Sequence, residues 1–168
     1  MKKLLILLFS IIISFNSYGE TKEYYYSNGQ IERETNYKDD KKDGKETWWR
    51  ENGQISAEIN YKDGNLVDKT YYGYYSNDQM ERETYYKGDK KDGKETWWYD
   101  NGQKSAEINY KDGNMVDKTR WHRSGPKNKV INYKDGKQVS ETRYKYYWNG
   151  DIKSETNYKD GKCISGDC

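Results

Sequence analysis

Residues that could perform catalysis are few in this 168-residue chain. His122 is its single histidine, so a metal cluster or a Ser–His or Cys–His pair would have to be assembled around that one side chain. We interpret His122 as a polar residue of an edge strand. Carboxylates are numerous, but they recur at a fixed position beside Lys and Arg, which favours cross-strand charge pairing over acid–base catalysis, as at Glu32, Glu34, Glu81 and Glu83. The sequence therefore predicts no enzyme and no catalytic residue.

A calcium loop is the other chemistry that the residue types suggest, because three aspartates fall within residues 39–43. Calcium prefers carboxylate oxygens, but three lysines crowd residues 41–45 of the same segment. Their charges disfavour a cation site, so we expect a solvated turn there. No metal and no cofactor is predicted.

Two cysteines, Cys163 and Cys168, enclose the tetrapeptide "ISGD". In an exported chain an even pair this close, with Gly166 between them, favours a small disulfide that ties down the last hairpin. A bridge between two chains and a redox centre are the alternatives.

The first nineteen residues have the pattern of an export signal. Lys2 and Lys3 precede the apolar run "LLILLFSIIISF", and small residues up to Gly19 suit cleavage before Glu20. A helix of those twelve residues would be only about 18 Å long, too short for a hydrocarbon core of about 30 Å. We therefore expect a secreted or cell-envelope protein with no stable membrane span after cleavage. Removal of the two lysines from a total of 30 Lys and Arg leaves 28 basic residues against 28 Asp and Glu.

The rest of the chain is an internal repeat. Residues 48–64 recur almost unchanged as residues 97–113. Dipeptides typical of turns recur every 23 to 25 residues, and a Lys-Asp-Gly turn signal lies between most of them. The dipeptides are Asn28-Gly29, Asn52-Gly53, Asn77-Asp78, Asn101-Gly102, Ser124-Gly125 and Asn149-Gly150. We predict six units of about 24 residues in a domain spanning residues 20–162, followed by a tail of residues 163–168.

Each unit alternates with the period of a β-strand, since Ile55, Ala57, Ile59 and Tyr61 are separated by polar residues. Asn-Gly and Asp-Gly between such runs indicate hairpins. We therefore predict an all-β fold, an elongated, twisted antiparallel array of β-hairpins with roughly twelve strands. A three-residue loop with a glycine bulge would pair Trp49 with Ile55, and we expect Trp49 to join the apolar face.

One position is aromatic in all six units, three residues before the turn dipeptide. We call these residues the aromatic ladder: Tyr25, Trp49, Tyr74, Trp98, Trp121 and Tyr146. One interpretation places the rings in a core, because the mature chain has few aliphatic residues. The other leaves them on an open sheet as a platform for sugar rings or a protein.

A basic stretch adds a second candidate surface. Residues 118–137 contain seven Lys or Arg against one Asp. We predict a basic patch that attracts an anionic surface, although chance clustering in a lysine-rich chain explains it equally well. Its members are Arg120, Arg123, Lys127 and Lys129.

Residues 24–162 resemble the MORN-repeat variant family. The segments that show this are "YYSNGQIERETNYKDDKKDGK" and "WWYDNGQKSAEINYKDG", with an aromatic pair, Asn-Gly-Gln, a Glu-bearing strand and Tyr-Lys-Asp-Gly-Lys. The sequence departs from this pattern at Asp78, at Gly88-Asp89 and in the fifth unit. The resemblance implies hairpin arrays used for interaction, and many bacterial members are described as YwqK-type antitoxins.

Together these observations predict an exported, non-enzymatic repeat protein that serves as a protein interaction or adhesion surface. Its expected partner is a protein or a cell-surface ligand, with Trp49, Trp98 and Trp121 as candidate anchors. A carbohydrate or cell-wall binding module is one alternative, and neutralisation of a toxin is another. No nucleic-acid partner is predicted.

Overall fold

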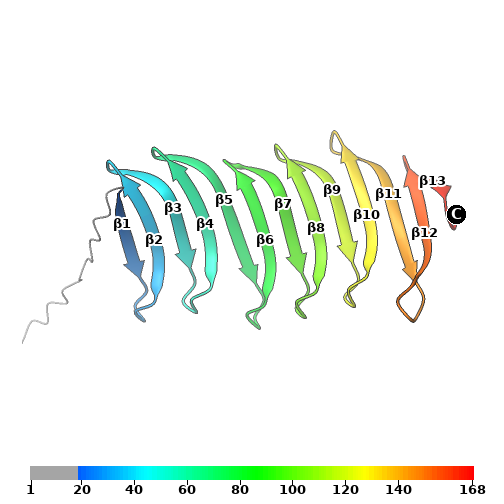
Figure 1. Cartoon of the computed structure of the whole chain (residues 1–168), viewed down its shortest axis with the longest axis horizontal. Helices are drawn as coiled ribbons and strands as arrows, with labels where there is room; N and C mark the ends of the chain where they lie inside the picture. The colour runs from blue at the N-terminus through cyan, green and yellow to red at the C-terminus, as the bar shows by residue number, and fades with distance from the viewer. Residues whose placement is uncertain (1–18) are drawn as a thin grey trace, which may run out of the picture.

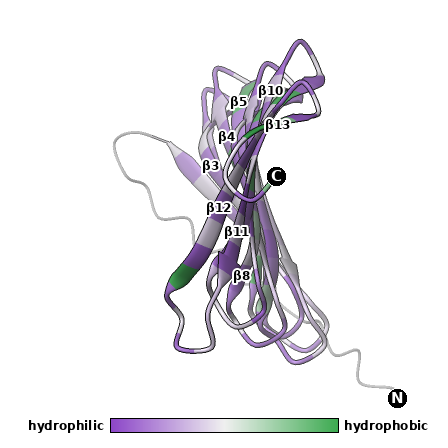
Figure 2. Ribbon diagram, turned by 90° about the vertical axis from the view of Figure 1, so that its right-hand side faces the viewer, coloured by the Kyte–Doolittle hydropathy of each residue, from purple (hydrophilic) through white to green (hydrophobic). Residues whose placement is uncertain are grey.

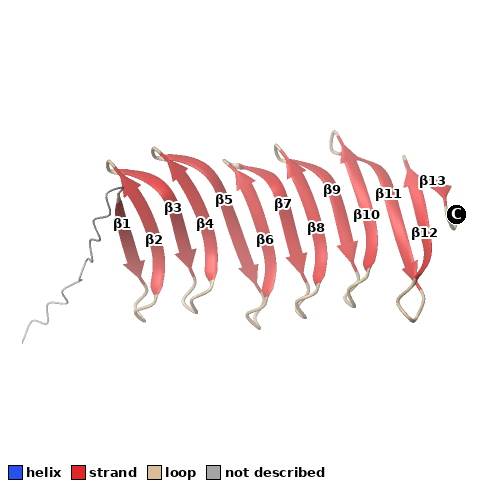
Figure 3. Ribbon diagram, in the orientation of Figure 1, coloured by secondary structure: helices blue, strands red, loops and turns tan. Residues whose placement is uncertain are grey.

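A computed structural model describes residues 19–168 of the chain. The predicted export signal therefore lies outside the described residues except for Gly19. All regular structure in the described part is β, and the strands form one antiparallel sheet in chain order (Figures 1 and 3). The strands are β1 (Glu20–Tyr25), β2 (Ile31–Lys38), β3 (Lys41–Trp49), β4 (Ile55–Lys62), β5 (Asn65–Tyr74), β6 (Met80–Lys87), β7 (Lys90–Trp98), β8 (Lys104–Lys111), β9 (Asn114–Trp121), β10 (Lys127–Lys134), β11 (Lys137–Tyr146), β12 (Ile152–Lys159) and β13 (Lys162–Ser165).

The predicted hairpin array is confirmed, with thirteen strands rather than twelve because residues 162–165 form a short last strand. The strands lie side by side along the long axis of the molecule, with β1 and β13 at opposite ends (Figure 1). The edge-on view shows a single twisted layer of strands with no second layer packed on it (Figure 2). Within residues 19–168, no second layer therefore covers either face of the sheet.

The hairpin loops that contain Asn-Gly have the predicted three-residue form with a glycine bulge. In the loop between β3 and β4, the amide of Gly53 donates to the carbonyl oxygen of Arg50 at 2.9 Å. The amide of Arg50 donates to the carbonyl oxygen of Gln54 at 2.8 Å. Gly53 has a φ of 84°, which a residue without a Cβ adopts freely. In the loop between β5 and β6, Asp78 takes the position of this glycine and has a φ of 64°.

The Lys-Asp-Gly segments form tighter, two-residue turns at the opposite ends of the strands from the Asn-Gly loops. Lys62 pairs with Asn65, and the two residues between them, Asp63 and Gly64, have φ values of 50° and 84°. Two consecutive positive φ angles define the type I′ turn that suits the twist of a hairpin. Three-residue loops and two-residue turns alternate along the chain and fix the register of the strands.

The predicted pairing of Trp49 with Ile55 is confirmed, but the face that we expected for Trp49 is wrong. Trp48 pairs with Ala57, so Ser56 is an extra residue that bulges out of β4 between the two pairs. Successive strand residues point to opposite faces, and Trp48 is therefore the tryptophan that shares a face with Ala57. The bulge separates Ile55 and Trp49 from the rest of the apolar set.

Few hydrophobic residues are fully buried in this single layer. The only ones within residues 19–168 are Ala57, Ile108 and Ile131. The other buried positions hold threonine and glutamate, shielded by long side chains on neighbouring strands. They are Thr35, Glu46, Thr47, Thr84, Glu95, Thr96, Glu141 and Thr156. The aromatic ladder does not form a buried core, since all six rings are half-buried or exposed.

Tyrosine hydroxyls connect three of the hairpin loops to the next loop along the sheet. The hydroxyl of Tyr75 donates to the carbonyl oxygen of Trp98 at 2.7 Å, and Tyr26 and Tyr99 make the same bond to Trp49 and Trp121. These bonds join units that are 22 or 23 residues apart in sequence. They make the stability of the joined units depend on one another, as expected for a repeat array.

Replacement of Tyr75 by Phe removes one of these bonds and keeps the ring. We expect the free energy of unfolding to fall by about 1 kcal/mol, the usual contribution of one hydrogen bond. Urea denaturation followed by circular dichroism measures this change. Tyr147→Phe is the control, because Tyr147 lies in the last hairpin and its exposed ring has no following hairpin to contact.

Candidate binding surface

One face of the sheet carries cations stacked on aromatic rings, and we call it the cation–aromatic face. Arg33 lies between two rings, with its guanidinium carbon 3.9 Å from the ring centroid of Tyr24 and 4.6 Å from that of Trp48. Cross-strand pairing places these three residues in one row. The same arrangement recurs along the sheet at Lys42 with Tyr61, Lys69 with Tyr71 and Tyr86, Arg82 with Trp97, Lys91 with Tyr110, and Arg143 with Tyr158.

Buried carboxylates hold this face together. Glu46 has a side-chain exposure of 2% and accepts hydrogen bonds from Thr35 Oγ1 at 2.8 Å and Trp48 Nε1 at 3.0 Å. The ammonium of Lys42 lies 2.6 Å from its Oε2. Burial raises the pKa of Glu46, but these three donors lower it by more, so the pKa lies below its usual value. Glu95 occupies the equivalent place in the duplicated block, with Thr84 as its donor.

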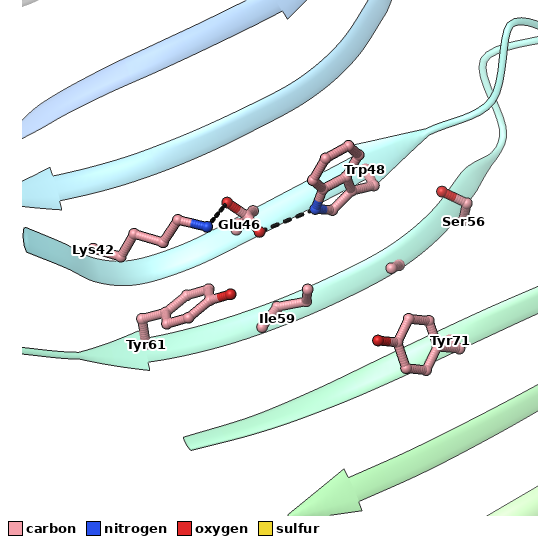
Figure 4. Close-up of a pocket in the computed structure, with 8 residues that line it drawn as sticks. Lys42, Glu46, Trp48, Ser56, Ile59, Tyr61 and Tyr71 are labelled. Atoms are coloured by element: carbon pink, nitrogen blue, oxygen red, sulfur yellow. Dashed lines mark hydrogen bonds and ion pairs between the residues drawn. The ribbon is translucent and has the colours of Figure 1, made fainter. Parts of the chain in front are cut away.

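A shallow hollow of about 560 Å³ opens on the same face between β3 and β5. Trp48 and Tyr71 form one end of it and Tyr61 the other, with Glu46 and Lys42 along one side (Figure 4). The hollow thus combines apolar rings with a fixed carboxylate and a fixed ammonium. Apolar rings with a few fixed polar groups are typical of ligand-binding sites.

The opposite face is mainly polar away from the aromatic ladder. Thr47 is buried there between Glu34 and Glu58, which pair with it from the two neighbouring strands. Glu58 forms an ion pair with Lys45 and accepts a hydrogen bond from the hydroxyl of Tyr72 at 2.9 Å. The Lys45 hydrogen bond, partly opposed by burial, lowers the pKa of Glu58. Charge pairing of strand carboxylates therefore occurs at Glu58, but not at the four carboxylates for which it was predicted. Within residues 19–168 no ion pair is formed by Glu32, Glu34, Glu81 or Glu83.

The aromatic ladder lies next to the Asn-Gly loops. Its members are two strands apart, which separates successive rings by roughly 10 Å, so they do not stack on one another. Instead the guanidinium of Arg50 lies 4.7 Å from the ring centroid of Tyr74, and the ammonium of Lys104 lies 5.4 Å from that of Trp121. Tyr25 is the most exposed member, at 51%. A binding role for the ladder stays a prediction.

The structure brings together only part of the predicted basic patch. Arg120 pairs directly with Lys129 across β9 and β10, and Lys118 lies two residues before Arg120. Burial, followed by repulsion from Arg120, lowers the pKa of Lys118. Lys129 is partly neutralised, because its ammonium lies 3.6 Å from Glu141.

The other two members of the patch are separate. Arg123 is in the loop between β9 and β10. Its guanidinium forms an ion pair with Asp100, in the loop between β7 and β8. Lys127 is exposed at the start of β10 and pairs with Trp121. The four residues therefore do not form one continuous cationic site.

The remaining predicted sites are structural. Cys163 and Cys168 form a disulfide within the chain, as predicted. His122 is not in an edge strand: it begins the loop between β9 and β10, where its ring contacts Tyr146 edge to face at 6.4 Å. Asp43 lies within β3, not in the expected turn, and its carboxylate accepts bonds from Lys62 Nζ and the amide of Asp63.

No group of three or more His, Cys, Asp or Glu side chains within residues 19–168 is arranged to hold a metal ion. None of the described segments forms a helix with the length and hydrophobicity needed to cross a membrane.

Sequence reasoning missed the main residues of the cation–aromatic face, Arg33, Trp48, Arg82 and Trp97. The position before each ladder residue is aromatic in only three of six units, and this irregularity concealed it. The useful signal was the arginine of "IERET" and "MERET", which recurs opposite each Trp-Trp pair.

Fold and surface together define a β-hairpin repeat protein with an open, aromatic sheet. The MORN repeat variant family matches three stretches of the chain, residues 21–39, 42–63 and 91–112, and the predicted resemblance is thus confirmed. These stretches are MORN repeat variants. Comparison with curated proteins gives no match.

Proposed function

We propose that this protein is exported and acts as a non-enzymatic binding protein, whose cation–aromatic face attaches to a protein or cell-surface partner. The single observation that supports this most is the uncovered row of guanidinium, ammonium and aromatic groups on one side of a single-layered sheet. MORN repeats are commonly protein-binding or membrane-binding modules. Export rests on the sequence of residues 1–19 alone.

Two side chains of this face are held in place before any partner arrives. Arg33 is held between two rings, and the indole of Trp48 is held by its hydrogen bond to Glu46. Ordering flexible side chains opposes association, so groups that are already fixed bind at a lower entropic cost. Aromatic and arginine side chains are also those that contribute most to protein interfaces.

Two adjacent tryptophans provide a matched test of which face binds. Trp97 lies on the cation–aromatic face and pairs with Arg82, whereas Trp98 is its neighbour in β7 and points to the other side. We expect Trp97→Ala to weaken retention on intact cells or on a protein array at least tenfold, and Trp98→Ala to weaken it less than threefold.

Circular dichroism and denaturation confirm that both variants are folded before retention is compared. If Trp98→Ala, Trp49→Ala and Trp121→Ala weaken retention while Trp97→Ala does not, the ladder predicted from the sequence is the binding surface. If no variant changes retention, an aromatic binding face is excluded.

A carbohydrate is the second candidate ligand, and the hollow beside Trp48 favours it. Trp48, Tyr61 and Tyr71 present rings to a hollow with room for a sugar, and Glu46 and Lys42 add polar groups. Retention of the protein on purified cell wall, lost in Tyr71→Ala, is the expected result if the ligand is a glycan. Toxin neutralisation has no support in the geometry and stays a prediction from the family resemblance.

A further inference from the structure

The last strand of the sheet is only half a strand. β13 has four residues and pairs with β12 only at Asn157, Tyr158 and Lys159. Over these residues its register and its bulge match those of β11 beside β10. β11, however, continues for six further residues, whereas β13 ends at Ser165. Residues 152–156 of β12 therefore have no strand beside them on that side.

The first strand of the sheet supplies the missing half. β1 has six residues, so β13 and β1 together have ten, the length of β11. Placed end to end, their sequences "KCIS" and "ETKEYY" align with "KQVSETRYKY" of β11, with five identities in ten positions. Among the strands of residues 19–168, none lies beside the outer side of β1 either.

We propose that copies of this chain join end to end, with β1 of one copy placed beside β12 of another in line with its β13. The two half-strands then form one complete strand, and a continuous sheet runs through both molecules. β1 and β13 lie at opposite ends of the array, so the strand is completed between copies and not within one (Figure 1). Each copy contributes both half-strands, and the assembly therefore extends as a filament.

The register of this junction follows from the β10–β11 pair, in which Val130 lies opposite Thr142 and Ile131 opposite Glu141. The equivalent residues of β12 are Glu155 and Thr156, and those of β1 are Thr21 and Glu20. The junction therefore pairs Glu155 with Thr21, Thr156 with Glu20, and Ser154 with Lys22.

The side chains at the junction fit this register. In two units a buried threonine donates to the glutamate opposite it, Thr35 to Glu46 at 2.8 Å and Thr84 to Glu95 at 3.2 Å. Thr156 is the buried threonine at the same position of β12. Because β13 ends early, the glutamate that belongs opposite Thr156 is missing, and Glu20 of a second copy provides it.

Two further groups on these edges agree with the pairing. The hydroxyl of Ser154 is buried with no hydrogen-bond partner within residues 19–168, and it would face the start of the incoming β1. Lys22 forms an ion pair with Glu20 at 3.6 Å, as Arg143 does with Glu141 in β11. If the register continues for one more residue, Glu23 lies opposite Lys153. These two side chains carry opposite charges, which favours the pairing.

The disulfide-bonded tail competes with this junction. The chain turns away at Gly166, with a φ of 91°, and a Cβ on this residue would lie 2.1 Å from the carbonyl oxygen of Glu155. The tail therefore occupies the place that Glu20 takes in the junction. It has to move aside when copies join, and its removal should strengthen association.

Site-directed crosslinking tests the register. Two chains that begin at Glu20 and carry Cys163→Ser and Cys168→Ser are mixed under oxidising conditions, one with Thr21→Cys and the other with Glu155→Cys. All strands lie within residues 20–165, so both chains retain the fold. We expect a crosslinked pair on non-reducing gels. The control pair, Thr21→Cys with Ser154→Cys, should give less than a tenth of that product, because the two thiols point to opposite faces.

Sedimentation velocity tests the assembly itself. The chain that begins at Glu20 should associate with increasing concentration, and a form that also lacks residues 166–168 and carries Cys163→Ser should associate at least tenfold more tightly. A tail-less form that stays monomeric to about 1 mM contradicts the proposal. Crosslinking of two Thr21→Cys chains to each other, or of two Glu155→Cys chains to each other, also contradicts the proposal. Either product would show that two β1 edges or two β12 edges pair.

Discussion

Replacement of Glu46 by Ala is expected to lower the free energy of unfolding by about 3 kcal/mol. The substitution removes the acceptor shared by Thr35, Lys42 and Trp48, and it leaves the buried hydroxyl of Thr35 and the half-buried indole of Trp48 without that partner. Urea denaturation of the two proteins at pH 7 measures the difference. Glu51→Ala is the control, because Glu51 is exposed in a loop and the change should cost less than about 0.5 kcal/mol.

The pH dependence of this effect separates the charge of Glu46 from its packing. The folded-state pKa of Glu46 lies below its unfolded value of about 4.3, so the ionised group stabilises the fold fully above that pH. This contribution is lost as the pH falls through the folded-state pKa. Glu46→Gln should therefore be less stable than wild type at pH 7, and the difference should shrink toward pH 3. An equal difference at both pH values would contradict the ion pair.

Replacement of Gly93 by Val should lower the free energy of unfolding by about 3 kcal/mol. Gly93 lies inside β7 with a φ of 109°, a backbone conformation that residues with a Cβ rarely adopt. Its Cβ would also lie 3.0 Å from the ring of Tyr85. The bulge at Gly93 turns the carboxylate of Asp92 toward Lys111 and the amide of Asp112, so distortion there also weakens the next turn.

Gly53→Asn is the matched control for Gly93. Gly53 also has a positive φ, but its Cβ would have no neighbour within 4 Å, and Asp78 occupies the equivalent loop position with a φ of 64°. We expect this variant to lose less than about 1 kcal/mol. If Gly53→Asn and Gly93→Val destabilise the protein equally, the interior bulge has no special structural role.

The local signals in the sequence were sufficient to predict the hairpins. Asn52-Gly53 and Asp63-Gly64 determine loop length because they supply the positive φ angles that each turn requires. The pairing of Trp49 with Ile55 followed from the loop type, and the nearness of Cys163 to Cys168 indicated their disulfide.

Features that depend on more than one turn could not be predicted. The bulge at Ser56 has no glycine or proline to mark it, yet it decides that Trp48 and not Trp49 shares a face with Ala57. The burial of Glu46 was also unexpected, because a carboxylate at a strand position is usually exposed. Its burial depends on Lys42 and on a threonine eleven residues away, which become neighbours only when the sheet forms.

Small-angle X-ray scattering of the dilute monomer tests the single-layered sheet most directly. Thirteen strands about 4.8 Å apart make a plate roughly 60 Å wide, 30 Å high and 10 Å thick, with a radius of gyration of about 19 Å. A compact domain of residues 19–168 would have a radius of gyration of about 15 Å. A value near 19 Å with the scattering profile of a flat particle is the predicted result. A value near 15 Å would mean that the sheet folds back on itself and that its faces are not open.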